Sequence, residues 1–370
     1  MISNTFEHTK QLVKNSYVIT WLLLAMEICK RVSCTLALCL VSLLVLSCTS
    51  DSQYQNPTAL QPLVAEWIKS PANNQTMKVE YPAVYDTFHQ RIIAFGGRAG
   101  NWDGVSETWA YDFKADTWTN MLPPTGPPWR ASHAMVYDPD RGKILLFGGD
   151  DFTKAFNDLW EYDYGLNTWT ELTPANPPDA RQMHNIVYDE KNEVMLLFGG
   201  RRAGGGAGFS DTWEYDHKTN RWRLLNPPQS PPIRDHVNLV YDIQHQKTIL
   251  YCGPISHNIS EISTWAYDYG TNTWSKLSLE QSPSGDHSGL VYNRNAGTTT
   301  YFGNSEITDS LEVWVFDYGS MVWIQASSAI LPLYKEHFGM AYDSDHNTYL
   351  ITGGFPDHKN WILKITTGSN

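Results

Sequence analysis

The sequence predicts an all-β fold: a six-bladed β-propeller made of four-stranded antiparallel blades. Three observations predict it. A block of about 51 residues recurs six times in phase. Each block holds short apolar or alternating runs, separated by turns rich in Asp, Asn and Gly that suit hairpins. After the N-terminal apolar segment, no stretch keeps a helical period over three turns.

Four anchors define each block, and each anchor lies in one predicted strand. The first is an apolar run ending in Tyr-Asp or a close variant, with the tyrosines Tyr85, Tyr137, Tyr188, Tyr241, Tyr292 and Tyr342. The second is an apolar run closed by a glycine pair or its remnant, at 96–97, 148–149, 199–200, 252–253, 303–304 and 353–354. The third is a tryptophan, at Trp109, Trp160, Trp213, Trp265, Trp314 and Trp361. The fourth follows nine residues later, at Trp118, Trp169, Trp222, Trp274 and Trp323.

The sixth block lacks its fourth anchor, and a matching tryptophan stands upstream at Trp67 in "AEWIKS". We therefore expect an N-terminal strand around Trp67 to complete the last blade, whose third strand ends near Ile365. This closure covers an exposed sheet edge and joins the first blade to the last. Six meanders stacked around an axis bury the faces that a single sheet would leave open.

The glycine pair, the Tyr-Asp and the two spaced tryptophans resemble the Kelch repeat, and the resemblance covers residues 63–366. It implies a Kelch-type six-bladed propeller. The sequence departs from the pattern at Cys252 and Asn304, which replace glycines, and again at the end of the sixth block. These departures bear on local turn geometry rather than on the fold.

Residues 1–47 are predicted to be a signal or leader segment. The apolar run "SCTLALCLVSLLVLS" follows Lys30 and Arg31, as in a secretory signal, and is shorter than the roughly 20 residues of a transmembrane helix. The string "VLSC" resembles a bacterial lipobox, which implies that Cys48 becomes the lipidated first residue of a cell-envelope lipoprotein. A signal-anchored membrane protein is the alternative.

The predicted domains follow from this reading. Residues 48–61 would be a flexible tether and residues 62–368 the propeller. Met26 begins a more ordinary signal, "MEICKRVSC", so the true start of translation could be Met26, with residues 1–25 an artefact.

Charge and cysteine usage limit the classes of partner. The formal net charge is −12, and the first 47 residues are net positive, so the body is strongly acidic. Such a body is a poor partner for nucleic acid or an anionic membrane surface, and membrane contact is expected through the N-terminal lipid alone. Only Cys252 lies in the body, so no internal disulfide framework is expected. No cofactor or metal is expected either.

The predicted strand order separates two faces. The turns after the first and third strands of each block are short, and we call their side the short-turn face. The loops after the second and fourth strands are longer and irregular, and we call theirs the long-loop face. Variable loops on a rigid frame commonly carry binding, so a ligand is expected on the long-loop face.

Cationic residues recur seven positions before the Tyr anchor. The six positions are Lys78, Arg130, Arg181, Arg234, Gly285 and Lys335. Gathered at a channel mouth, they would suit an anionic ligand such as a carboxylated sugar. Alternatively, each cation bonds the loop backbone or an acid of its own or the next blade. Histidines follow at His133, His184, His236, His287 and His337, the last three one position earlier relative to the tyrosine.

Two tryptophans of the body fall outside the repeat. Trp102 and Trp129 lie on the long-loop face, in loops of the first and second blades. An exposed pair of indoles can stack on sugar rings, and packing as loop caps is the alternative.

The sequence favours a non-catalytic, surface-tethered module outside the cytosol that binds an unknown protein or glycan through the long-loop face. The alternative is an enzyme, epimerase-like or lyase-like, acting on acidic sugars, because Kelch-like propellers include a sialic-acid epimerase. Catalytic residues cannot be assigned by that resemblance. The chain has no His-Glu-x-x-His, no Gly-x-Ser-x-Gly and no phosphate loop. A structural subunit of an envelope assembly is a third possibility.

Overall fold

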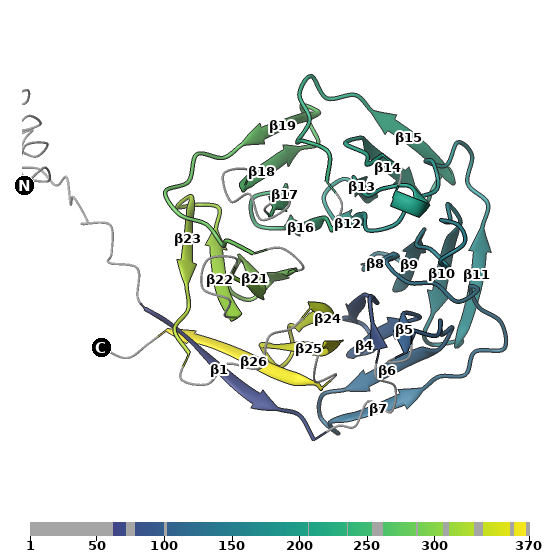
Figure 1. Cartoon of the computed structure of the whole chain (residues 1–370), viewed down its shortest axis with the longest axis horizontal. Helices are drawn as coiled ribbons and strands as arrows, with labels where there is room; N and C mark the ends of the chain where they lie inside the picture. The colour runs from purple at the N-terminus through teal and green to yellow at the C-terminus, as the bar shows by residue number, and fades with distance from the viewer. Residues whose placement is uncertain are drawn as a thin grey trace, which may run out of the picture. The chain divides into compact units, whose positions relative to one another are not determined.

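Six antiparallel four-stranded sheets are arranged around a central axis in the computed structural model (Figure 1). The structure describes residues 62–71, 78–99, 102–205, 207–234, 236–253, 262–285, 288–305, 311–328, 336–355 and 359–367. Residues from Pro62 onward form one compact unit. The predicted all-β, six-bladed propeller is confirmed. Residues 1–61, with the predicted signal, the tether and Cys48, lie outside the described residues.

The strands follow the chain from the inner to the outer edge of each blade. Blade one is β3 (Ala83–Asp86), β4 (Arg91–Phe95), β6 (Thr108–Asp112) and β7 (Thr117–Asn120). Blade two is β8 (Ala134–Asp138), β9 (Lys143–Phe147), β10 (Leu159–Asp163) and β11 (Thr168–Leu172). Blade three is β12 (Asn185–Asp189), β13 (Val194–Phe198), β14 (Thr212–Asp216) and β15 (Arg221–Leu225).

The remaining blades repeat this order. Blade four is β16 (Asn238–Asp242), β17 (Lys247–Cys252), β18 (Ser263–Asp268) and β19 (Thr273–Lys276). Blade five is β20 (Gly289–Asn293), β21 (Thr298–Asn304), β22 (Leu311–Asp317) and β23 (Val322–Gln325). Blade six is β24 (Glu336–Asp343), β25 (Thr348–Phe355), β26 (Trp361–Thr367) and the N-terminal β1 (Leu63–Lys69). Two short strands, β2 (Lys78–Val79) and β5 (Arg98–Ala99), pair with each other, and a 3₁₀ turn spans Ala203–Gly205.

The N-terminal strand closes the ring as predicted. β1 pairs antiparallel with β26, from Leu63 opposite Thr367 to Lys69 opposite Trp361, and the two lie side by side in Figure 1. The side chain of Trp67 is buried, with its ring centroid 5.0 Å from that of Phe302 in blade five. The first and last parts of the propeller are therefore joined by a full strand ladder and by packing.

The core is divided among the blade interfaces. Six apolar clusters each combine side chains from two neighbouring blades. The fourth-strand tryptophans insert against the preceding blade. The indole N–H of Trp169 donates to Thr108 Oγ1 at 2.9 Å, and that of Trp274 donates to Thr212 Oγ1 at 2.9 Å. The repeated tryptophans thus stabilise the contacts between blades.

The Tyr-Asp anchor has two structural uses at the short-turn face. Asp86 Oδ1 accepts hydrogen bonds from the backbone N–H groups of Phe88 and His89, each at 3.0 Å, and so shapes the hairpin turn. The tyrosine hydroxyl reaches the turn of the preceding blade, as Tyr188 donates to Asp140 at 2.7 Å. This motif therefore belongs to the scaffold.

The glycine pairs sit where a side chain would not fit. Gly149 has φ +93°, and a Cβ there would lie 2.7 Å from both the Ala131 carbonyl oxygen and His133 Cβ. In blade five, Gly303 and Asn304 instead continue strand β21 to Asn304. In blade four, Cys252 ends strand β17 and is buried. The departures from the repeat therefore change where a loop begins, and the blade keeps its four strands.

Candidate functional site

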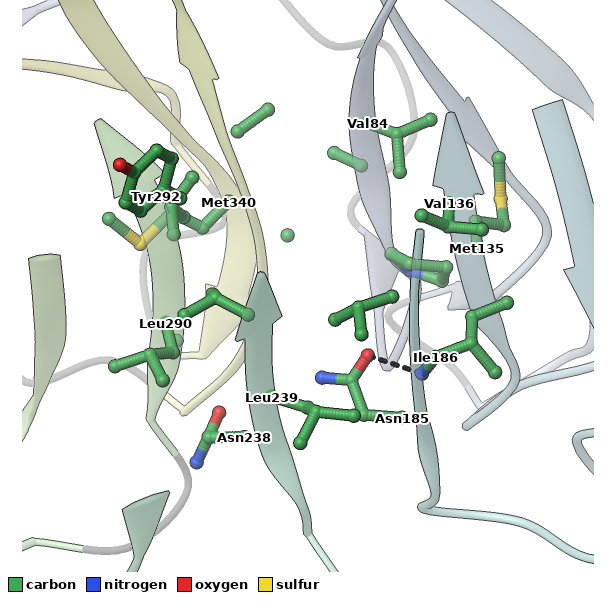
Figure 2. Close-up of a pocket in the computed structure, with 18 of the residues that line it drawn as sticks. Val84, Met135, Val136, Asn185, Ile186, Asn238, Leu239, Leu290, Tyr292 and Met340 are labelled. Carbon is green, nitrogen blue, oxygen red and sulfur yellow. Dashed lines mark hydrogen bonds between the residues drawn. The ribbon is translucent and has the colours of Figure 1, made fainter. Parts of the chain in front are cut away.

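The channel through the propeller is lined by the innermost strand of each blade: β3, β8, β12, β16, β20 and β24. Their side chains enclose a cavity of about 410 Å³. Aliphatic groups such as Val84, Val136 and Leu290 dominate the part drawn in Figure 2, and Asn185 and Asn238 are among them. The Asn185 amide oxygen is engaged by the backbone N–H of Ile186 at 2.8 Å.

Residues of several blades meet at the long-loop end of the channel, where backbone hydrogen bonds link one blade to the next; in blade four the N–H of Val237, next to His236, donates to the Met183 carbonyl at 3.3 Å. The backbone N–H of Glu80 donates to the His337 carbonyl at 2.8 Å, that of Ser132 to Glu80 at 3.0 Å and that of Met183 to Ser132 at 2.8 Å. We call Glu80, Ser132, Met183, His236 and His337 the mouth belt. All five have positive φ, between 51° and 57°. This strained conformation is held by contacts between blades.

The predicted histidines fall into two groups. His133 and His184 are 5% exposed and lie edge-on to Phe95 and Phe147 of the preceding blades, with ring centroids 5.7 and 5.4 Å apart. Burial lowers the pKa of both, that of His184 to about 3, so both rings are neutral at pH 7.

His236 and His337 belong instead to the mouth belt. Their ring centroids are 6.0 Å apart, and His337 Nδ1 lies 3.8 Å from Glu80 Oε1. The histidines at the channel mouth lie one position earlier relative to the Tyr anchor than the histidines packed between blades. This difference in sequence position therefore separates the two groups. His287 lies outside the described residues.

Two cations of the predicted set, Arg130 and Arg181, are buried inside their own blades. Arg130 is 0% exposed and its guanidinium donates to the two carboxylate oxygens of Asp158 at 2.6 and 2.7 Å. Arg181 is also 0% exposed and binds Asp211 in the same way at 2.7 and 2.9 Å. Although burial acts in the opposite direction, the bonds from these arginines hold the pKa of both carboxyls below the usual range.

For Arg130 and Arg181 this geometry agrees with the alternative in which each cation bonds the loop backbone or an acid of its own or the next blade. Arg130 also donates to the Gly148 carbonyl at 2.9 Å, and Arg181 to the Gly199 carbonyl at 3.0 Å. Arg234 is 7% exposed and donates to the Ile233 carbonyl at 3.1 Å. None of these three arginines lines the cavity. Lys78 begins β2, and Lys335 lies outside the described residues, so the cationic ligand site stays a prediction.

The structure brings the two non-repeat tryptophans together with Arg98 and Phe152, two residues that were not among the predicted site residues. Trp102 is 47% exposed and Phe152 is 57% exposed, and they come from the long loops of blades one and two. Trp129 is partly buried, with its ring centroid 5.8 Å from that of Phe152. A Cβ at Gly104 would lie 1.9 Å from Trp129 Cε3, so the indole packs directly on the Gly104 backbone.

Arg98 is the centre of this group. Its side chain contacts Glu80 at 2.6 Å and Asp150 at 3.1 Å, which come from blades one and two. Its guanidinium carbon lies 4.0 Å from the ring centroid of Phe152 and 6.0 Å from that of Trp102. We call Arg98, Trp102, Trp129 and Phe152 the aromatic patch. It sits beside the mouth belt, because Glu80 belongs to that belt.

The backbone holds both exposed aromatic residues in an unusual conformation. Trp102 has φ +70° and Phe152 has φ +67°. The N–H of Trp102 donates to the Ala99 carbonyl at 2.7 Å, and the N–H of Phe152 donates to Asp150 Oδ1 at 2.9 Å. Bulky residues at positive φ cost free energy, and such strain is concentrated at functional sites. Local hydrogen bonds therefore hold both aromatic residues at these strained backbone positions.

A sequence signal for Arg98 did exist. Arg98 follows the glycine pair of blade one, and Asp150 follows that of blade two, so opposite charges occupy the same repeat position in neighbouring blades. Phe152 had no such signal, because its place depends on the path of an irregular loop.

The described residues lack two features. They contain no group of three or more His, Cys, Asp or Glu side chains that could hold a metal ion. They also contain no helix with the length and hydrophobicity needed to cross a membrane.

Comparison with known proteins places the fold in a family. The model of the Attractin/LZTR1 beta-propeller family matches residues 92–359. The chain belongs to this propeller family. Together with the six blades, the match establishes a propeller of the Kelch type, a class that generally serves as interaction modules.

Curated relatives of this Kelch-type chain share only part of their length with it. It is 25% identical over 188 residues to Mei4-dependent protein 6 of Schizosaccharomyces pombe, covering 47% of this chain and 26% of that protein. It is 25% identical over 169 residues to the dynein alpha chain of the flagellar outer arm of Chlamydomonas reinhardtii, covering 42% and 4%. It is 38% identical over 109 residues to multiple epidermal growth factor-like domains protein 8 of Mus musculus, covering 27% and 4%.

Proposed function

We propose that this Kelch-type propeller is a non-catalytic module that binds a protein or carbohydrate partner through its long-loop face. One observation carries the proposal: the aromatic patch presents two large exposed rings on a frame that fixes them. Aromatic and arginine side chains are enriched at binding interfaces, where a few of them supply most of the free energy.

The test compares two patch variants with a matched control. Trp102→Ala and Phe152→Ala each remove an exposed ring of the long-loop face, and Phe88→Ala removes a 78% exposed ring of the short-turn face. We expect both patch variants to lose capture of partners and glycans from arrays, while Phe88→Ala keeps it. Equal unfolding midpoints show that folding is unchanged. Saturable binding that ignores both patch variants contradicts this site.

We also propose that the module works outside the cytosol, tethered by a lipid on Cys48. The support is the sequence of residues 33–48, where an apolar run precedes a lipobox-like string. Cys48→Ala should move the protein from the detergent phase to the aqueous phase in a phase-separation assay, and remove the lipid mass from the mature N-terminus. Unchanged partition with an intact leader would favour the signal-anchored alternative.

The enzymatic alternative needs cationic side chains that can meet an acidic sugar. Arg130 and Arg181 are instead buried against Asp158 and Asp211, so no described contact favours it. Turnover of a sialic or uronic acid substrate by the purified chain would reverse this preference.

A further inference from the structure

We propose that the aromatic patch recognises a basic protein segment, with a lysine or arginine side chain lying against Trp102 and Phe152 and paired with the carboxylate of Asp151. This inference rests on the proposed function, because it names the kind of partner for the same face.

The first argument is the charge beneath the patch. Arg98 supplies one positive charge, and it is paired with two carboxylates, Glu80 and Asp150. The side chains of all three are 8% exposed or less. The guanidinium of the patch is thus buried and contacted on two sides by acidic side chains, so little of its charge is exposed to an approaching anion.

The second argument is the carboxylate at the edge of the patch. Asp151 precedes Phe152 and is partly exposed. Its Oδ1 accepts the backbone N–H groups of Thr153 and Lys154, each at 2.9 Å, and no described residue donates to Oδ2. Although desolvation acts in the opposite direction, these hydrogen bonds hold the pKa of Asp151 below its usual range. Asp103, next to Trp102, is exposed as well.

The third argument is the exposure of the Phe152 ring. Arg98 covers one face of the Phe152 ring at 4.0 Å and the Trp129 ring centroid lies 5.8 Å away, yet Phe152 is still 57% exposed, so much of its ring remains open to solvent. A cation over an exposed aromatic face gains about 0.5–1 kcal/mol, and its aliphatic stem can lie along the ring. The acidic chain, with a formal net charge of −12, adds long-range attraction for a basic partner.

Other ligand classes use less of this surface. An anionic glycan would meet the carboxylates of Asp103 and Asp151, and the one exposed cation beside them in the described residues, Lys154, already lies near Asp151 and over the Phe156 ring. A neutral glycan could stack on Trp102, but it would leave the charge of Asp151 without a role. A basic segment uses the rings and the carboxylates together, which is the reason for preferring it.

The experiment measures binding of the full chain to synthetic Gly-Ser peptides of equal length that carry lysine and arginine, glutamate or glutamine. Neutral and sialylated oligosaccharides are tested alongside. We expect the basic peptide to bind best, and its affinity to fall between about 50 and about 300 mM salt. Asp151→Asn keeps the turn acceptor but removes the charge, and should weaken binding by roughly two- to fivefold. Trp102→Ala should weaken it by a similar factor, and Phe88→Ala should not.

The outcomes separate the two proposals. Binding of the glutamate peptide or of a glycan that depends on Trp102 and Phe152, without preference for the basic peptide, overturns the partner class and keeps the binding face. Basic-peptide binding that ignores Trp102→Ala and Phe152→Ala is nonspecific attraction and overturns this inference. If no ligand or cellular partner responds to the patch variants, the proposed function fails as well.

Discussion

A single repeat position holds His184 in blade three and Val237 in blade four. Both side chains fill the same space against a glycine of the preceding blade. A Cβ on Gly148 would lie 2.7 Å from His184 Cε1, and a Cβ on Gly199 would lie 2.8 Å from Val237 Cγ2. An apolar side chain therefore serves in blade four where an imidazole serves in blade three. The imidazole is neutral because burial lowers its pKa.

This equivalence predicts the effect of His184→Val on stability against pH. The pKa of His184 is about 3 in the folded chain and 6.5 when unperturbed. The unfolded chain therefore binds the extra proton between these values, so the contribution of His184 is intact above pH 6.5 and is lost as pH falls toward 3. In that window, protonation of His184 lowers the free energy of unfolding by up to about 1.4 kcal/mol for each pH unit of acidification. His184→Val should abolish this part of the pH dependence.

The measurement is urea unfolding at several pH values from neutral to mildly acidic. Val237→Ala, at the equivalent position of blade four, removes no titratable group, so it serves as the control and should lower stability without changing the slope. An unchanged slope in His184→Val would show that this ring is accessible to protons in the folded chain.

Asp158→Asn tests the buried ion pair between Asp158 and Arg130. It leaves the fully buried Arg130 guanidinium without its counter-charge, so the free energy of unfolding should fall by about 3–5 kcal/mol. Asp163→Asn alters a more exposed pair with Lys143 and should cost about 1 kcal/mol or less. Equal losses in the two variants, measured by chemical denaturation, would contradict the structural role given to Arg130.

At the scale of strands, the sequence was sufficient to predict the order and number of strands in each blade, because each strand carries its own anchor. The tyrosines, glycine pairs and tryptophans recur with the strands. The absence of the fourth anchor from the sixth block indicated the closure through Trp67. The patch could be predicted only in part. Trp102 and Trp129 stood out because they have no counterpart in the repeat. Phe152 depends on an irregular loop at positive φ, and the contact of Arg98 with it joins two blades, so the repeat pattern does not specify either feature.

The closing strand gives a prediction at this scale. Trp67 is 6% exposed and packs on Phe302 and Trp361, so Trp67→Ala should lower the free energy of unfolding by about 3–5 kcal/mol. Ile68→Ala, on the 38% exposed side of the same strand, should cost far less. A loss for Ile68→Ala as large as that for Trp67→Ala would mean that pairing, and not packing, carries the closure.

For the whole molecule, the ring protects edges that an open array of blades would expose. Removing residues 1–70 takes away β1 and leaves β26 as an unpaired edge, which invites pairing between molecules. We expect this shortened chain to self-associate in size-exclusion chromatography with light scattering, whereas a chain starting at Pro62 stays unchanged. A synthetic peptide of residues 62–71 should reverse the association, and a peptide with Trp67 replaced by Ala should do so less well.

The pairing of β1 with β26 also sets the order of events during folding. Five blades consist of hairpins that can form as soon as their own residues emerge, because their partners are close in sequence. The last blade must wait, since its outer strand is made first and its neighbour last. Loop-closure entropy grows only by about 0.6 kcal/mol for each doubling of length, so this delay is a matter of time more than of final stability. Until the end of the chain arrives, β1 is a strand without a partner, and any factor that shields it in that interval protects the whole propeller.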